Sequence, residues 1–227
     1  MENNPKPTLQ ELIEALKSAD LELARNEDVY DLVKKGLWRL DHNEFKAAHS
    51  LLNKAFEIDE QQTYHYMKEE YRDRNEFEKV EKCYIELLKL YLKNPLRSRY
   101  HHDLGCFYFE RGDNEKSKLH LKRAISTGKG LQWKSHISLG TVYCDEESWE
   151  LAVMNYEKGL ELGEGSAADI IYDVLFNISH CYSKLKDKSK AKQAIERANE
   201  IKKIVEESES YIRVDLIRDK LKEWYQK

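Results

Sequence analysis

Histidine and cysteine side chains occur where they could do chemistry together. His65 and His102 hold equivalent places in two repeats of the sequence, and Cys106 follows His102 by one helical turn. If successive repeats stack, these three residues become neighbours, and imidazole and thiolate are ligands that zinc prefers. No pair among them has an established ligand spacing. We therefore expect neither a metal nor another cofactor.

No motif of a known catalytic centre is present in the sequence. The chain has no phosphate-binding glycine loop and neither of the patterns G-x-S-x-G and H-E-x-x-H. Its many carboxylates have no spacing that singles out an acid–base pair. The sequence therefore predicts that the protein is not an enzyme.

A second set of side chains suits recognition. Arginine and aromatic residues are frequent anchors of protein interfaces, and these residues fall on helix faces that packing does not use. We predict that they line a groove for a protein or peptide segment. The candidates are Tyr66, Arg99, His102, Phe109, Lys134, Asn177 and His180.

The elements that would position these side chains follow a recurring spacing. A small residue is followed after twelve positions by a second, and after seven more by a third, in repeats that start 32 to 39 residues apart. Such a period is typical of stacked helical hairpins. The first two small residues would let paired helices approach closely, and the third would receive the next hairpin. The spacing occurs at Gly36, Ala48 and Ala55, at Gly105, Ser117 and Ala124, at Gly140, Ala152 and Gly159, and at Ser179, Ala191 and Ala198, whereas Lys68, Val80 and Leu87 keep the offsets without the small residues.

Helical periodicity predicts five hairpins, and no segment has the sustained alternation of a strand. We expect three parts: an N-terminal capping helix in 1–28, five repeats over 29–205 and a C-terminal capping helix in 206–227. Gly112 is a natural helix C-cap. The expected helix pairs are 28–40 with 44–58, 61–72 with 76–92, 96–111 with 114–126, 131–144 with 149–162, and 167–185 with 188–205, flanked by helices near 8–25 and 211–225.

The repeats resemble the tetratricopeptide repeat family. The matching motifs are D-L-G-C-F-Y at 103–108 with E-R-G-D at 110–113, and S-L-G-T-V-Y at 138–143 with W-E-L-A-V-M-N-Y-E-K-G-L-E-L at 149–162. The resemblance implies an all-α, right-handed superhelical solenoid of about five helix-turn-helix repeats. It also implies a concave surface, lined by first helices, that binds peptides or protein segments without catalysis.

Composition narrows the class of partner. The 227 residues carry a net charge of −4, which is too small to indicate nucleic acid or a membrane surface. The charge is unevenly spread, at about +6 over 93–134 and about −8 over 135–183. The four cysteines, the absence of a long apolar run and the polar N-terminus predict a reduced, cytoplasmic protein.

Three roles remain open at this point. The first is an adaptor that binds a protein segment in the groove. The second is a peptide-responsive signalling regulator that acts through protein contacts, as bacterial regulators with similar repeats do. The third is a self-associating scaffold that pairs through the helix bearing Trp224.

Overall fold

The computed structural model describes residues 28–91, 97–127, 131–163, 168–207 and 210–225, and the regular elements within them are all α-helices. The chain divides between Leu90 and Tyr91 into two compact units. The predicted all-α class is confirmed. The helix expected near 8–25 lies outside the described residues.

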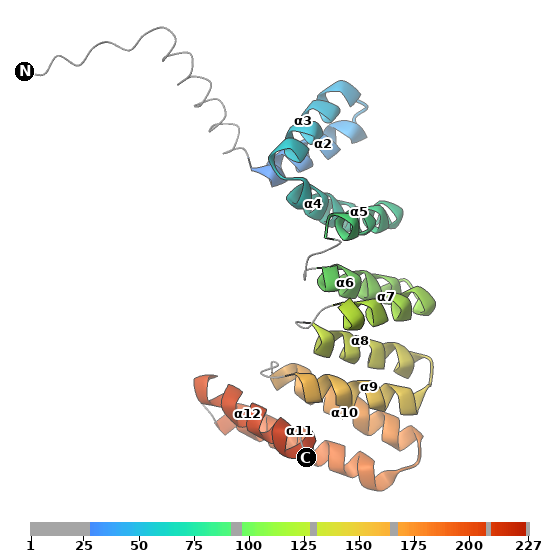
Figure 1. Cartoon of the computed structure of the whole chain (residues 1–227), viewed down its shortest axis with the longest axis vertical. Coiled ribbons are helices and arrows are strands. Elements are labelled where there is room, and N and C mark those ends of the chain that lie inside the picture. The colour runs from blue at the N-terminus through green and yellow to red at the C-terminus, as the bar shows by residue number, and fades with distance from the viewer. Residues whose placement is uncertain (1–27, 92–96, 128–130, 164–167, 208–209, 226–227) are drawn as a thin grey trace, which may run out of the picture. The chain divides into compact units, whose positions relative to one another are not determined.

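The first unit contains two helical hairpins. Helices α2 (Val29–Asp41) and α3 (Phe45–Ile58) form one pair, and α4 (Glu60–Asp73) and α5 (Phe77–Leu90) form the other (Figure 1). The first helices of the two hairpins, α2 and α4, pack against each other. The buried faces of these amphipathic helices make the core of the unit.

The second unit contains three hairpins and a terminal helix. Consecutive hairpins touch through α7 and α8 and through α9 and α10, and the first helices α6 and α8 also meet. The observed bounds lie close to those predicted from periodicity. The pairs are α6 (Arg97–Glu110) with α7 (Asn114–Thr127), α8 (Gln132–Asp145) with α9 (Trp149–Leu162), and α10 (Ala168–Lys184) with α11 (Lys188–Glu207), followed by α12 (Ser210–Tyr225).

A left-handed residue closes the first helix of every hairpin. It stands seven positions after the first small residue of its repeat, and the next residue donates its N–H back across the turn, as Asp113 does to the Tyr108 carbonyl at 2.9 Å. That next residue directly precedes the second helix, and the Asp113 carboxylate accepts from the Lys116 N–H at 3.0 Å. The twelve-residue spacing thus runs from the middle of the first helix, through a turn of constant length, to the first turn of the second helix. The left-handed residues are Asn43, Asn75, Gly112, Glu147 and Lys186.

The glycines at 36, 105 and 140 in the first helices each make room for one large side chain from the second helix. A Cβ added to Gly105 would lie 2.7 Å from Leu121 Cγ, and one added to Gly140 would lie 2.7 Å from Tyr156 Cδ1. Both partners are fully buried. Gly159 differs from the prediction, because its nearest neighbours are atoms of α8 in its own hairpin and not of the following one.

Lys68 shows how the second repeat manages without a small residue. Its side chain is 4% exposed, and its ammonium lies 5.0 Å from the ring centroid of Tyr84, the residue that would otherwise enter the gap. The same ammonium pairs with the Glu69 carboxylate at 2.8 Å. The lysine stem fills the space, and the ring and carboxylate satisfy its charge.

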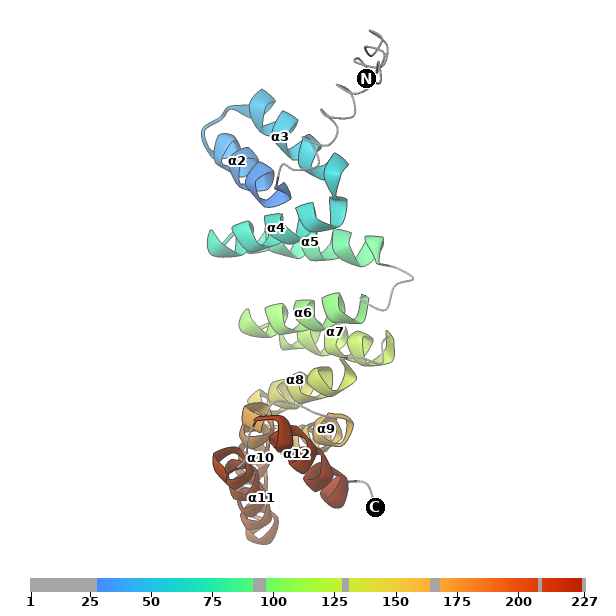
Figure 2. The ribbon, with the colours of Figure 1, turned by 90° about the vertical axis from the view of Figure 1, so that its left-hand side faces the viewer.

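Helix α12 returns onto the second helices of the last two hairpins. It contacts α9 and α11, and Figure 2 shows it beside them. Its Ile217 and Leu221 are buried in the cluster formed by α9, α10 and α11. The Arg197 guanidinium carbon of α11 lies 5.2 Å from the centroid of the Trp224 ring. Trp224 is half-buried, and self-association through this helix stays a prediction.

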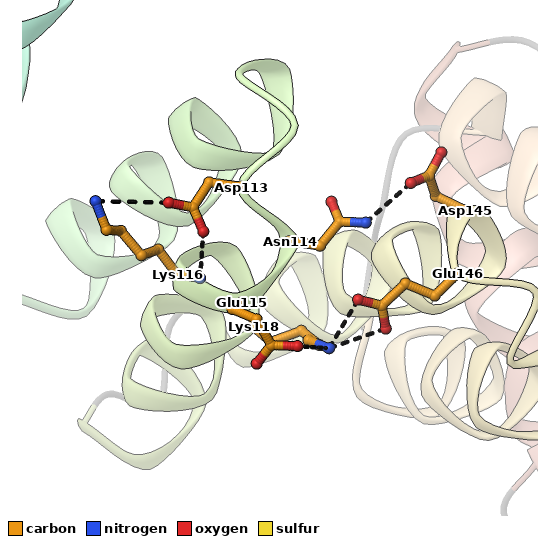
Figure 3. Close-up of polar contacts among 7 residues, drawn as sticks. All are labelled: Asp113, Asn114, Glu115, Lys116, Lys118, Asp145 and Glu146. Carbon is orange, nitrogen blue, oxygen red and sulfur yellow. Dashed lines mark hydrogen bonds and ion pairs between the residues drawn. The ribbon is translucent and has the colours of Figure 1, made fainter.

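Polar contacts join the third and fourth hairpins near their turns (Figure 3). Lys118 of α7 donates to Glu146 Oε1, just beyond α8, at 2.7 Å. Asn114 donates to Asp145 Oδ2 at 2.9 Å. Lys118 and Glu146 are both half-buried, and the pair links α7 to the end of α8.

Candidate functional site

The first helices of the second unit carry a polar cluster where α6 meets α8. His102 Nδ1 lies 3.1 Å from Ser135 Oγ. Cys106 Sγ lies 3.7 Å from His102 Nε2 and 3.6 Å from Ser138 Oγ. Burial lowers the pKa of His102, and the charge of Lys134 acts in the same direction while Asp103 opposes it. The imidazole is therefore neutral near pH 7.

Two of the predicted cations are exposed at equivalent places on α6 and α8. Arg99 Nε lies 3.9 Å from the Asp103 carboxylate in a loose pair, and 63% of its side chain is exposed. The Lys134 ammonium lies 5.2 Å from the centroid of its neighbour Trp133. The corresponding position on α10 is the exposed carboxylate Asp173. The charge at this repeat position therefore changes from positive on α6 and α8 to negative on α10.

Helix α10 contributes aromatic and imidazole groups to the same face. Phe176 is 58% exposed, the most of any apolar side chain described. His180 is exposed, and its ring centroid lies 5.8 Å from that of Trp149, edge to face. The Lys184 ammonium lies 5.7 Å from the centroid of the same indole ring. A large exposed aromatic side chain is a feature that suits recognition.

The remaining predicted residues have packing contacts. Phe109 packs against the buried cluster of Leu121, Leu139 and Val142. Asn177 is half-buried and hydrogen-bonds Tyr156. Tyr66 lies in the first unit, where its ring meets that of Tyr30 at a centroid distance of 5.3 Å. The structure thus brings Arg99, His102, Lys134 and His180 onto first helices of one unit.

His101 and His120 form a buried pair inside the hairpin of α6 and α7. Their Nδ1 atoms are 3.2 Å apart. Burial, the neighbouring His120 and the charges of Arg97 and Arg123 lower the pKa of His101 to about 4. His101 therefore belongs to the core and cannot take part in binding on the first-helix face.

A metal site receives no support from the geometry. Within the described ranges, no three His, Cys, Asp or Glu side chains are grouped closely enough to hold an ion. His65 belongs to the first unit, whereas His102 and Cys106 belong to the second.

In the part of the chain that the structure describes, no helix is both long and apolar enough to span a bilayer.

Two features of the second unit escaped the sequence reasoning. Phe176 shares a repeat position with His65 and His102, and that shared position was the available signal. The other feature is a hollow of about 860 Å³ beside α9, whose lining includes Met154, Glu157, Tyr182 and Tyr225. It depends on the return of α12 onto α9, which the helical periodicity does not reveal.

Comparison with known proteins identifies the repeats. The tetratricopeptide repeat model matches residues 98–127 and 172–204, which correspond to α6–α7 and most of α10–α11. Two of the five hairpins therefore match the tetratricopeptide repeat family, as the sequence resemblance predicted. A comparison with curated proteins finds no match.

Solved structures share the fold at low sequence identity. BtubC from P. vanneervenii is 19% identical, with a TM-score of 0.60 over 89% of this chain and 94% of that one. PilF of Pseudomonas aeruginosa is 17% identical, with a TM-score of 0.55 over 90% and 86%. YrrB, a TPR protein with an unusual peptide-binding site, is 14% identical, with a TM-score of 0.53 over 90% and 97%. These likenesses confirm the solenoid class.

Proposed function

We propose that this protein is an interaction adaptor that binds an extended protein segment along α6, α8 and α10. The observation that carries the proposal is the row of exposed, chemically distinct side chains at equivalent repeat positions. Arg99, Lys134 and Asp173 occupy the same position in three successive repeats, and the exposed Phe176 lies one turn further along α10. Stacked repeats place equivalent positions side by side, and an extended segment can contact several of them at once.

The charges define the segment that fits best. An acidic side chain would lie against Arg99 and Lys134, and a basic one would lie against Asp173. An apolar side chain between them would cover Phe176, because a large exposed aromatic group gains most from burial. Electrostatic complementarity of this kind fixes the direction in which a segment binds as well as its affinity.

The test is a selection of peptides from a random library on the immobilised full chain. Selected peptides are then measured by fluorescence anisotropy against the wild type and the Arg99→Glu/Lys134→Glu variant. We expect the variant to weaken binding by roughly tenfold to a hundredfold. A peptide whose acidic residues are changed to lysine should recover part of the loss in the variant.

Lys192→Glu/Lys203→Glu is the matched control. Both lysines are exposed on the second helix α11, so this variant makes the same change in net charge away from the proposed surface. Equal weakening by the two variants would reveal a general charge effect and would count against the site. Unchanged binding by Arg99→Glu/Lys134→Glu, with the helical circular dichroism retained, would reject it.

A further inference from the structure

The contacts of Cys106 distinguish it from the other cysteines of the chain. All four cysteines are in the thiol form. Cys83 and Cys181 are buried, while Cys106 and Cys144 are both partly exposed. Cys106 adjoins an imidazole nitrogen at 3.7 Å, whereas the nearest polar group recorded for Cys144 is the Cys181 thiol at 3.9 Å. The two partly exposed thiols thus differ mainly in whether a base adjoins them.

The surroundings of His102 orient it as a base toward this thiol. In the tautomer that carries its proton on Nδ1, the ring donates to the buried Ser135 Oγ at 3.1 Å. Its Nε2 is then unprotonated and accepts from the Cys106 thiol. A thiol, an imidazole and an orienting hydroxyl in this order are the arrangement that activates nucleophilic cysteines.

Further groups stabilise the thiolate once it forms. The Ser138 hydroxyl lies 3.6 Å from the sulfur and can donate to it. Proton transfer makes His102 a cation beside the sulfur, and a neighbouring cation lowers the pKa of a thiol. Burial and the Lys134 charge lower the pKa of His102 and oppose the imidazolium, whereas Asp103, which also pairs with Arg99, stabilises it.

We propose that Cys106 is a reactive thiol, activated by His102, that forms a mixed disulfide with anionic low-molecular-weight disulfides such as glutathione disulfide. The Cys106 thiolate attacks one sulfur of the disulfide, so that a new S–S bond forms as the old one breaks. The departing thiolate takes the proton held by His102. Cys106 is oxidised and the released thiol is the reduced product, so no other reactant is needed. Arg99 on α6 and Lys134 on α8 attract the anion.

Competitive alkylation with iodoacetamide tests the reactivity in one sample. Limited labelling from pH 6 to pH 9, read by peptide mass spectrometry, gives the rate at each cysteine. We expect Cys106 to react at least about tenfold faster than Cys144 at pH 7, as a pKa about one unit lower would produce. A rate at Cys106 equal to or below that at Cys144 would overturn the proposal, and this comparison needs no variant.

Variants separate activation by the imidazole from simple accessibility. His102→Gln keeps a polar side chain of similar size but removes the base. It should move the alkylation midpoint of Cys106 to higher pH while Cys144 is unaffected. Ser135→Ala should produce a smaller shift in the same direction. An unchanged pH profile in His102→Gln would reject the role of the imidazole.

Incubation with glutathione disulfide then tests the product. We expect one glutathione adduct per chain, on Cys106, that is lost on reduction. An adduct on another cysteine with Cys106 unmodified would contradict the assignment. These experiments use no protein partner, so their outcome is independent of segment binding along α6, α8 and α10.

Discussion

The left-handed turn residues offer a direct test of how the hairpins are built. Glu147 and Lys186 occupy the turns of the last two hairpins with φ values of 56° and 62°. Both side chains are exposed. We predict that Glu147→Gly and Lys186→Gly each stabilise the protein, because glycine adopts this conformation without a steric penalty.

The expected magnitude follows from two opposing effects. A non-glycine residue in the left-handed region costs roughly 1–2 kcal/mol. Glycine also gives the unfolded chain more conformational entropy, which lowers the gain in stability by about 0.4–1 kcal/mol. The net gain in the free energy of unfolding is therefore about 0.5–1 kcal/mol for each substitution. Because each effect is confined to the backbone of its own turn, the double variant should gain about the sum of the two.

Urea unfolding followed by circular dichroism measures the effect. Gly112→Ala is the reverse substitution in the same kind of turn, where φ is 74° and no neighbour would touch an added Cβ. It should destabilise by about 1 kcal/mol through backbone strain alone. Asn75→Gly should change little, because asparagine tolerates this region. Destabilisation by both Glu147→Gly and Lys186→Gly would refute the description of the turns.

Three further predictions concern the core and the contacts between hairpins. The native state resists protonation of His101, whose pKa is lowered from 6.5 to about 4. The free energy of unfolding should therefore fall by up to about 3 kcal/mol as the pH drops from 6.5 to 4. Acid titration of a His101→Gln variant should show no such fall. Gly140→Ala should destabilise by about 1–2 kcal/mol in thermal unfolding, because overlap with the Tyr156 ring outweighs the gain in helix propensity. Lys118→Met, which removes the pair with Glu146, should cost about 1 kcal/mol or less in urea unfolding, and a cost that does not shrink in high salt would contradict its electrostatic origin.

The helix bounds could be predicted from the sequence because each hairpin is determined by residues within a single repeat. The first-to-second spacing of twelve residues contains a whole turn, so the predicted and observed bounds of α9 coincide at Trp149 and Leu162. The glycine at 112 was recognised as a helix cap. Glu147 and Lys186 were not, since residue type alone gives no sign of a left-handed conformation at glutamate or lysine.

The site was less predictable because it depends on contacts between repeats. The hydrogen bond of His102 to Ser135 spans 33 residues and requires the register between α6 and α8. The role of Lys68 could not be predicted either. A lysine at a small-residue position suggests that the repeat has degenerated, whereas the structure shows its side chain packed beside Tyr84. The return of α12 onto α9 likewise results from tertiary packing.

Hydrogen exchange of the full chain with and without a library-selected peptide tests the central claim most directly. Binding along the first helices predicts slower amide exchange in α6, α8 and α10, with smaller changes in α7 and α11. The same footprint should vanish in the Arg99→Glu/Lys134→Glu variant. Protection centred instead on α9 and α12, around the hollow that includes Met154 and Tyr225, would contradict the account and move the binding surface to the second helices.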